Sequence, residues 1–305
     1  MAIADDTVDE DGPTAGERAW AAIKRFAVFG SNADPNKPHT FFYRHRLLIR
    51  ITHWLNAIVL FVMLGSGLQI FNAHPALYLG KTSNFDHPIL SMTAAQDANG
   101  QLHGYTWIAG TRFETTGWFG ASETDGVMQA RGFPQWATIP GTQWLALGRL
   151  WHFFFAWLFV FNGTLFAIWA LSSRHFRDLL PTKADIKHLP SEIVSHAKLK
   201  FAHDERAKHY NAIQKLTYFL VIFGLGPLVV LTGLTMSPTM DAAVPFLPWI
   251  FGGRQTARTI HFLCAFSFLG FFIVHMVMVV LSGTWNNVRS MITGYYAIEK
   301  EPGHE

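Results

Sequence analysis

Four long apolar stretches constrain what this chain can fold into. Each has about the 20 helical residues needed to cross a hydrocarbon core roughly 30 Å thick. Only 15% of the 305 residues are charged, against about 25% in soluble domains. The sequence therefore predicts an all-α membrane protein, a bundle of four transmembrane helices within residues 47–283. The apolar stretches that form these helices cover residues 51–71, 150–171, 216–236 and 260–281.

The segments outside the apolar stretches differ in character. Residues 1–46 are expected to form a polar, partly disordered arm with a short amphipathic helix, and residues 284–305 a tail. The 73–148 connection is too long for an ordinary loop, and its Trp, Phe and Gly content predicts short strands or a lid. The 172–215 connection is expected to hold a short interfacial helix. We find no internal repeat and no cleavable signal peptide, so the first span is expected to direct its own insertion.

Basic residues predict the orientation. The 172–215 connection carries nine Lys and Arg residues, whereas the longer 73–148 connection carries three. The positive-inside rule then places the 172–215 connection and both termini in the cytoplasm, for a multi-pass protein of the inner (plasma) membrane. The formal net charge of +3 is explained by this topology, and no nucleic-acid partner is expected.

Histidines inside the apolar stretches are the main functional signal, because a polar side chain in hydrocarbon is costly unless it is used. Their depths form two pairs, His152 with His261 near the outer face and His53 with His275 near the cytoplasmic face. The other eleven histidines lie in connections or tails. A zinc site would instead gather its ligands at one height.

The spacing on the fourth helix supports two levels. His261 and His275 are fourteen residues apart, so on an α-helix their side chains lie within about 40° of each other and about 21 Å apart along the axis. Two imidazoles at each level suit two b-type haems with six-coordinate iron. Such iron has no open position for a substrate, which favours an electron carrier.

Arginine precedes three of the four histidines by three residues, at Arg50, Arg149 and Arg258. At this spacing the two side chains share a helix face, and a guanidinium there suits a haem propionate. The alternative is that these arginines are only interfacial anchors.

Small residues in the spans have two explanations. A glycine lets either a porphyrin ring or a neighbouring helix approach the backbone, and the sequence does not separate the two. The glycines are Gly65, Gly67, Gly163 and Gly270. The single cysteine, Cys264, is expected to be a buried, inert thiol.

These features resemble the cytochrome b subunits of membrane-bound respiratory complexes. The relatives are the formate dehydrogenase gamma subunit, the nickel-iron hydrogenase cytochrome b and especially the thiosulfate reductase type. The resemblance covers all four helices and includes the fourteen-residue histidine spacing. Its segments are RITHWLNAIVLFVMLGSGLQIF, GRLWHFFFAWLFVFNGTLFAIW, KHYNAIQKLTYF and TARTIHFLCAFSFLGFFIVHMVMVV.

The resemblance implies roles for particular residues. His152 and His261 would ligate the outer haem b, and His53 and His275 the inner one. Formate dehydrogenase relatives bind quinone near the inner haem with a Tyr-Asn-x-x-Gln-Lys segment, which corresponds here to residues 210–215.

Within that segment, Asn211 and Gln214 are the candidates to bind quinone carbonyls. Ile213 stands where those relatives commonly have glycine, which makes a close quinone approach harder. The alternative is that Asn211 and Gln214 only cap the third helix.

The predicted function is an electron relay. An extracytoplasmic oxidoreductase subunit, such as a molybdopterin or iron–sulfur protein, would dock on the 73–148 connection and exchange electrons with quinone in the lipid membrane. We find no nucleophile constellation, dinucleotide fingerprint or phosphate loop, so no catalytic site of its own is expected. The alternatives are a transporter or anchor whose histidines serve metal or proton relay, and a cytochrome without an outer partner, for which the long connection would be only a lid.

Overall fold

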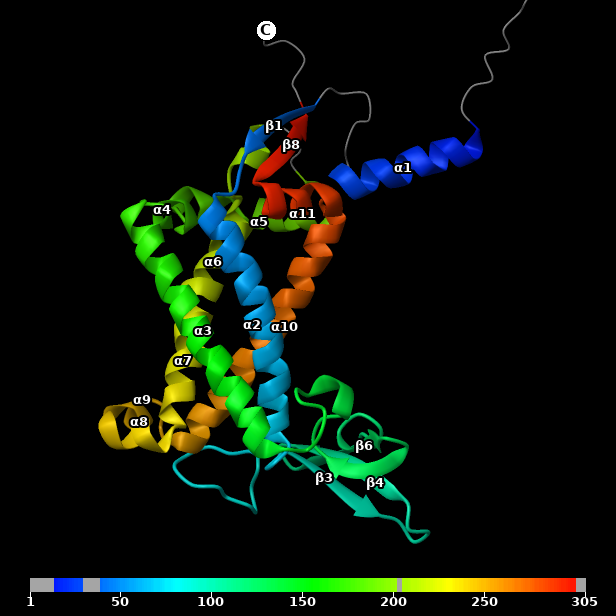
Figure 1. The fold of residues 1–305 in the computed structure, drawn as a ribbon, viewed down its shortest axis with the longest axis vertical. Coiled ribbons are helices and arrows are strands. Elements are labelled where there is room, and N and C mark those ends of the chain that lie inside the picture. The colour runs from blue at the N-terminus through cyan, green and yellow to red at the C-terminus, as the bar shows by residue number, and fades with distance from the viewer. Residues whose placement is uncertain (1–13, 30–38, 202–204, 300–305) are drawn as a thin grey trace, which may run out of the picture. The chain divides into compact units, whose positions relative to one another are not determined.

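The computed structural model describes residues 14–29, 39–201 and 205–299 (Figure 1). The chain divides into two compact units. We call residues 51–180 and 215–271 the helical unit, and residues 1–50, 181–214 and 272–305 the terminal unit. The boundaries after residues 50, 214 and 271 fall inside helices, and the boundary after residue 180 falls between two helices.

Four helical segments are long and apolar enough to cross a membrane, which confirms the four predicted spans. They begin four to ten residues earlier than expected, at residues 47, 145, 206 and 254. Three spans contain the continuous helices α2 (Leu47–Phe71), α3 (Leu145–Ser172) and α10 (Arg254–Leu281). The third span along the chain contains α6 (Ala212–Phe219), η3 (Leu220–Leu225) and α7 (Gly226–Thr235).

The segment η3 is a π-helical turn. Pro227 in the next turn has no N–H to donate, and its ring would clash with the carbonyl four residues earlier in a regular α-helix. The amide of Gly226 accordingly bonds the carbonyl of Val221, five residues back. The span thus continues past the proline through a widened turn.

Aromatic contacts hold the spans together within the helical unit. The ring centres of Phe71 on α2 and Phe262 on α10 are 4.9 Å apart. Those of Phe159 on α3 and Phe268 on α10 are 6.3 Å apart in an edge-to-face arrangement. The helix α10 therefore packs against both α2 and α3.

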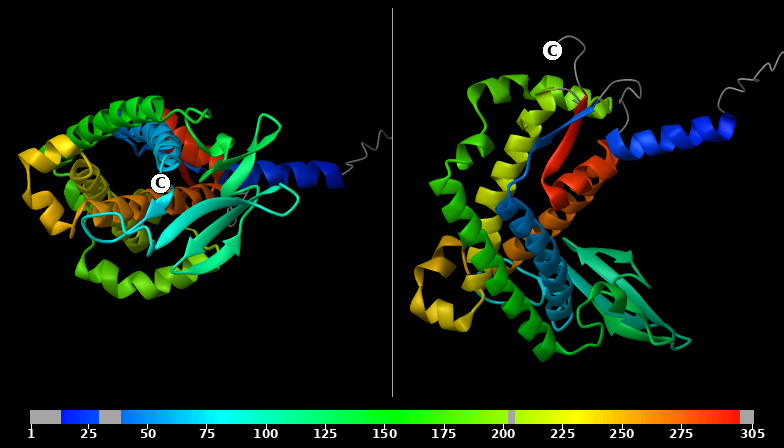
Figure 2. Two further views of the ribbon diagram at one scale, coloured as in Figure 1. Left: turned by 90° about the horizontal axis from the view of Figure 1, so that it is seen from below. Right: turned by 45° about the horizontal axis from the view of Figure 1, so that its top comes forward.

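The connection between α2 and α3 contains two small antiparallel sheets, which confirms the predicted strands. The first sheet has the order β2-β3-β4-β5, and β6 pairs with β7 in the second. A buried core joins the first sheet to the end of α2, and it consists of Phe71, Leu77, Met92 and Phe133. Figure 2 shows the strands from two further directions. The elements are β2 (Ala76–Leu77), β3 (Leu90–Gln96), β4 (Leu102–Ile108), β5 (Thr111–Glu114), β6 (Gly120–Thr124), β7 (Val127–Arg131) and the 3₁₀ turn η1 (Gln135–Ala137).

A buried arginine ties the second sheet to the chain that leads into α3. Arg131 is 3% exposed, and it donates to the carbonyls of Phe133 and Gly141 and to the hydroxyls of Thr124 and Thr138. Burial lowers its pKa. With four acceptors around it, the guanidinium fixes the corner between β7 and η1.

Short helices complete the helical unit. The turn α4 (Phe176–Leu179) follows α3, and α8 (Pro238–Ala243) and α9 (Phe246–Ile250) connect α7 to α10.

The terminal unit joins the two ends of the chain. Strand β1 (His39–Tyr43) pairs antiparallel with β8 (Tyr295–Glu299), in a register that sets Phe41 opposite Ala297. The side chain of Asn286 bonds both the N–H and the C=O of Ala297, which attaches β8 to the preceding helix. The unit's helices are α1 (Ala15–Phe29), α5 (Lys183–Ala197), the 3₁₀ turn η2 (Glu205–Lys208) and α11 (Thr284–Thr293).

Two predictions in this unit are confirmed, the short helix in the N-terminal arm (α1) and the one in the 172–215 connection (α5). The pairing of β1 with β8 was not predicted. The prediction of a partly disordered arm falls mainly on residues 1–13 and 30–38, which lie outside the described residues.

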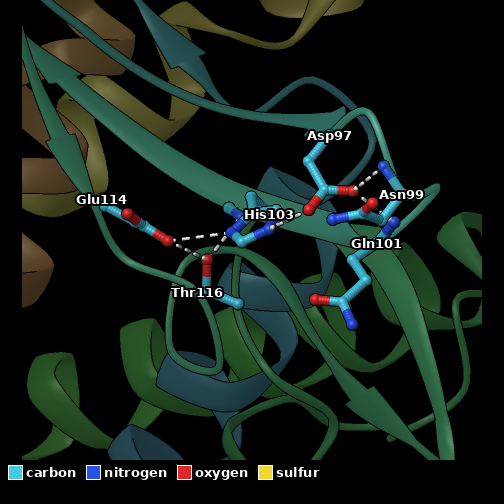
Figure 3. Close-up of polar contacts among 7 residues, drawn as sticks. Asp97, Asn99, Gln101, His103, Glu114 and Thr116 are labelled. Atoms are coloured by element: carbon cyan, nitrogen blue, oxygen red, sulfur yellow. Dashed lines mark hydrogen bonds and ion pairs between the residues drawn. The ribbon is translucent and has the colours of Figure 1, made fainter.

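A charged cluster links β4 to its neighbours (Figure 3). His103 Nδ1 lies 2.9 Å from Glu114 Oε1 on β5, and His103 Nε2 lies 3.5 Å from Asp97 Oδ2 after β3. The hydrogen bond to Glu114 is the main cause that raises the pKa of His103. Hydrogen bonds lower the pKa of both carboxyls, chiefly from the Gln101 amide for Asp97 and from His103 for Glu114.

These shifts predict how the β3–β5 sheet responds to pH. Because the pKa of His103 is raised, its contribution is fully present below the ordinary histidine pKa of about 6.5 and is lost as the pH rises through the higher folded-state pKa. The carboxylate contributions are lost only as the pH falls below about 4. We expect amide exchange in residues 97–114, corrected for intrinsic rates, to be slower at pH 6 than at pH 9. His103→Gln should abolish this difference, and an unchanged pH dependence in that variant would contradict the assignment.

Candidate functional site

Two of the four intramembrane histidines meet inside the helical unit. His152, in the second turn of α3, and His261, in the second turn of α10, have ring centres 6.2 Å apart and ring planes inclined by 66°. Both rings are half-buried. The structure therefore brings together the pair that the sequence assigned to the outer level.

This separation fits two imidazoles on opposite sides of one metal ion. A ring nitrogen binds a metal at about 2.0 Å and lies about 1.1 Å from its own ring centre, so two such rings have centres about 6.2 Å apart. Among the described residues, no group of three or more His, Cys, Asp or Glu side chains gathers as a metal site. Two protein ligands suit a haem, since the porphyrin itself supplies the other four nitrogens.

Each histidine ring is held by a neighbouring helix through Nδ1. His152 Nδ1 lies 3.2 Å from the carbonyl oxygen of Met63 on α2, and His261 Nδ1 lies 2.9 Å from that of Val229 on α7. These contacts leave Nε2 of each ring as the nitrogen for a metal. Hydroxyls at Ser66 and Thr232 also contact the two rings, and the sequence reading missed both.

The three predicted arginines have different surroundings. Arg258 donates to the carbonyl oxygen of His74 and lies over the ring of Phe71, with 5.4 Å between Cζ and the ring centre. Arg149 is exposed and lies 5.6 Å from the ring centre of Phe153. Arg50, in the terminal unit, donates to the carbonyl of Ile292. Each guanidinium has five N–H donors, so these contacts are compatible both with anchoring and with binding a propionate.

A basic hollow lies one turn before His261. It has a volume of about 230 Å³ and is lined by Lys81, Met236, Arg254, Gln255 and Arg258. Three of the five side chains are cationic and none is acidic, which suits carboxylates such as haem propionates. The sequence analysis did not identify Lys81 or Arg254 as site residues, although Arg254 lies one helical turn before Arg258.

The neutral state of His74 is compatible with this cationic region. Burial, helped by the nearby charge of Arg258, lowers the pKa of His74. Its ring stacks on Tyr78 with 5.7 Å between ring centres, and Thr259 of α10 donates to the carbonyl of Tyr78. These contacts hold the chain that leaves α2 against the start of α10.

The comparisons with known proteins agree with this geometry. The sequence model of a family described as "Prokaryotic cytochrome b561" matches residues 44–294. The chain belongs to this family. A curated relative, "Putative protein-methionine-sulfoxide reductase subunit YedZ1" of Azospira oryzae, is 29% identical over 149 residues, which are 48% of this chain and 71% of the relative. No solved structure gave a significant match.

Membership of the cytochrome b561 family confirms the resemblance to membrane cytochromes b. The protein is a multi-pass membrane cytochrome with b-type haem and a role in electron transport. This favours the electron-carrier hypothesis over a transporter or anchor with histidines for metal or proton relay.

The second pair of histidines is divided between the two units of the cytochrome. His53 belongs to the helical unit and His275 to the terminal unit, so their pairing stays a prediction. Both rings are half-buried, and the ring of His53 lies edge-on to Trp54, with 5.4 Å between ring centres. His275 and His261 share the continuous helix α10, as the predicted two-level arrangement requires.

The candidate quinone residues form a reciprocal helix cap in the terminal unit. The amide of Asn211 donates to Gln214 Oε1 over 3.2 Å, and the amide of Gln214 donates to Asn211 Oδ1 over 2.8 Å. Asn211 and Gln214 therefore cap the start of α6, as the alternative interpretation of these two residues predicted. The amide nitrogen Nδ2 of Asn211 also lies 3.4 Å from His196 Nε2.

The glycines of the spans differ in what a side chain at each position would contact. A Cβ on Gly65 would lie 2.7 Å from the Ile139 side chain, and a Cβ on Gly67 would lie 3.3 Å from His152 Cε1. Gly65 therefore allows close packing, and Gly67 allows the histidine ring to approach. A Cβ on Gly163 or Gly270 would meet no atom within 4 Å. Cys264 is buried, as expected.

A buried asparagine joins α3 to α2 directly beside His53. Asn162 is 1% exposed, and its Nδ2 donates to the carbonyl of Thr52 over 2.9 Å and to Asn56 Oδ1 over 2.8 Å. Both amide hydrogens are thereby used. Because water is absent from the hydrocarbon layer, this pair of bonds holds the two helices in one register near the histidine.

A double-mutant cycle measures this link. We expect Asn56→Ala and Asn162→Ala to destabilise the folded protein with a coupling free energy of about 0.5–1.7 kcal/mol, the range found for hydrogen bonds between membrane helices. The measurement is reversible unfolding in mixed micelles for the wild type, the two single variants and the double variant. Additive effects of the two substitutions would show that this contact contributes nothing of its own.

Proposed function

We propose that this cytochrome is the dihaem electron-transfer subunit of a respiratory oxidoreductase, linking an extracytoplasmic partner to quinone. The observation that carries the proposal is the facing pair of His152 and His261. Their ring centres are 6.2 Å apart, a distance that would suit two imidazoles on one haem iron, and each Nδ1 contacts a helix carbonyl. The Nδ1 contacts leave Nε2 of both rings available to a metal.

The chain's own residues have separable tasks in the relay. A bound haem b supplies a one-electron carrier whose potential depends on its ligands and surroundings. His152 and His261 would hold the haem iron through Nε2, and Arg258, Arg254 and Lys81 would offer positive charge to its carboxylates. The apolar spans exclude water from the space between them.

We assign a second haem to His53 and His275. The support is the helix α10, which runs without interruption from Arg254 to Leu281. On such a helix the fourteen-residue spacing places His261 and His275 on nearly the same face, about 21 Å apart along the axis. His53 is the fourth histidine of the predicted apolar stretches and lies near the start of α2.

The partner is proposed to be an oxidoreductase subunit of the molybdopterin or iron–sulfur type. The relative from Azospira oryzae is named as a subunit of a reductase, and the α2–α3 connection has exposed aromatic side chains beside its strands. Trp118 and Trp136 are 63% and 74% exposed, and their ring centres are 6.1 Å apart. Exposed tryptophans are common anchors of protein interfaces.

The positive-inside rule sets the proposed topology. The 172–215 connection holds nine of the 24 Lys and Arg residues, whereas the 73–148 connection holds three. Both termini would therefore face the cytoplasm, and the strands β2–β7 the opposite side of the inner membrane. Asn211 and Gln214 would then lie on the cytoplasmic side. There they would bind quinone, where its reduction takes up protons from the cytoplasm.

Difference spectra of histidine variants test the haem assignment. We expect about two b haems per wild-type chain by pyridine haemochrome. His152→Ala and His261→Ala should each remove the same spectral component, while His53→Ala and His275→Ala should each remove the other. The exposed loop histidine His87 provides the control, and His87→Ala should retain both haems. Loss of one component by His152→Ala and of the other by His261→Ala would contradict the pairing.

A cap-preserving substitution separates the two roles of Asn211. Serine caps helices about as well as asparagine but has no amide group for a quinone carbonyl. We expect Asn211→Ser to keep the wild-type melting temperature and to slow reoxidation of the dithionite-reduced protein by a short-chain quinone at least tenfold. A wild-type reoxidation rate would mean that Asn211 is only a cap.

A further inference from the structure

Two buried hydroxyls contact the facing histidines in the same way. Ser66 on α2 and Thr232 on α7 are both 0% exposed. Ser66 Oγ lies 3.1 Å from His152 Nδ1, and Thr232 Oγ1 lies 3.2 Å from His261 Nδ1. Each hydroxyl thus shares the ring nitrogen with a backbone carbonyl of its own helix, three residues earlier.

The hydrogens of these hydroxyls are already committed. Ser66 Oγ donates to the carbonyl of Val62, and Thr232 Oγ1 to that of Leu228, each over 2.7 Å. A hydroxyl has one hydrogen, so the oxygen presents lone pairs to the histidine. The backbone carbonyl beside it is also only an acceptor. The Nδ1 atoms of His152 and His261 must therefore carry the hydrogen, and Nε2 keeps the lone pair that binds iron.

A glycine follows each hydroxyl residue and completes the match. A Cβ on Gly67 would lie 3.3 Å from Cε1 of His152, and a Cβ on Gly233 would lie 3.2 Å from Cε1 of His261. The local sequences align over six residues, Met-Leu-Gly-Ser-Gly-Leu at 63–68 and Val-Val-Leu-Thr-Gly-Leu at 229–234. Two different helices thus present a carbonyl, a hydroxyl and a glycine to a histidine at the same relative positions.

We propose that Ser66 and Thr232 are positioning residues that hold His152 and His261 in the Nδ1–H tautomer and lower the reduction potential of the haem between them. The inference rests on the proposed assignment of that haem. An acceptor at Nδ1 makes imidazole a stronger electron donor to its metal, and a stronger donor stabilises the ferric state. Removal of either hydroxyl should therefore favour reduction.

Thr232 gives the sharper test, because valine has nearly its shape without the hydroxyl and serine keeps the hydroxyl without the methyl group. We expect Thr232→Val to shift the reduction equilibrium at least threefold toward the ferrous state, which is about 28 mV for a one-electron couple at 59 mV per tenfold change. Thr232→Ser should stay close to wild type. Ser66→Ala should shift the same component in the same direction.

The experiment is a spectroelectrochemical titration of the purified full chain with its haems bound. Thr235→Val is the matched control, because Thr235 is also 0% exposed on α7 and its hydroxyl makes the same bond to the carbonyl four residues earlier. The shift should appear only in the component that His152→Ala removes. Low-temperature electron paramagnetic resonance of the ferric protein should show changed g values for that component.

The possible outcomes distinguish a failure of this inference from a failure of the proposal that His152 and His261 bind one haem. Equal potentials for Thr232→Val, Thr235→Val and wild type would overturn the inference, even with both haems bound. An equal shift in Thr232→Ser and Thr232→Val would also overturn it, because packing would then be the cause. Full haem retention by His152→Ala and His261→Ala would instead remove the proposed ligand pair. If Ser66→Ala fails to fold, the Thr232 variants decide the question.

Discussion

The absence of water from a hydrocarbon layer is the constraint on which this structure depends. A polar group inside the spans must find its partner on another part of the protein, and here the partners are mostly helix carbonyls. Asn162 bonds the carbonyl of Thr52, and the two facing histidines contact those of Met63 and Val229. A helix carbonyl has a second lone pair beyond its own backbone bond. The spans therefore supply acceptors for side chains without breaking their hydrogen-bond ladders.

Because of this constraint, the geometry of the candidate site depends on how the helices pack against one another. Each facing histidine lies on one helix, and the atoms that orient its ring lie on another, α2 for His152 and α7 for His261. The π-helical turn η3 precedes α7, and a widened turn changes which residues of the following helix face inward. The turn η3 therefore helps to set the rotation of α7 about its axis, and this rotation directs Thr232 toward His261. Loops have no part in these contacts, which suits a site that must keep its geometry through many turnovers.

The sequence predicts the spans and one histidine pair well, because both signals are local. Hydropathy over 20 residues marks a helix, and the depth of a histidine follows from its place in that helix. The hydroxyls were missed because Ser66 and Thr232 read as small residues in apolar helices, and their role appears only when another helix is beside them. The six-residue match between 63–68 and 229–234 was the available signal, but it is too short to stand out as a repeat.

The strands of the α2–α3 connection were predicted from composition, whereas Arg131 and its four acceptors depend on a fold that composition does not specify. Asn211 and Gln214 had two interpretations in the sequence, and the structure shows the helix cap.

The pairing of β1 with β8 has a consequence for biosynthesis. Strand β1 leaves the ribosome about 250 residues before its partner, which at 5–20 residues per second is a delay of roughly 10–50 s. During that time all four spans are synthesised while β1 has an open edge, and open edges invite wrong pairings. The sheet closes only after translation has passed residue 299. Closure of this sheet is thus a late event of assembly, and a nascent chain that stalls after its last span keeps β1 available to chaperones and proteases.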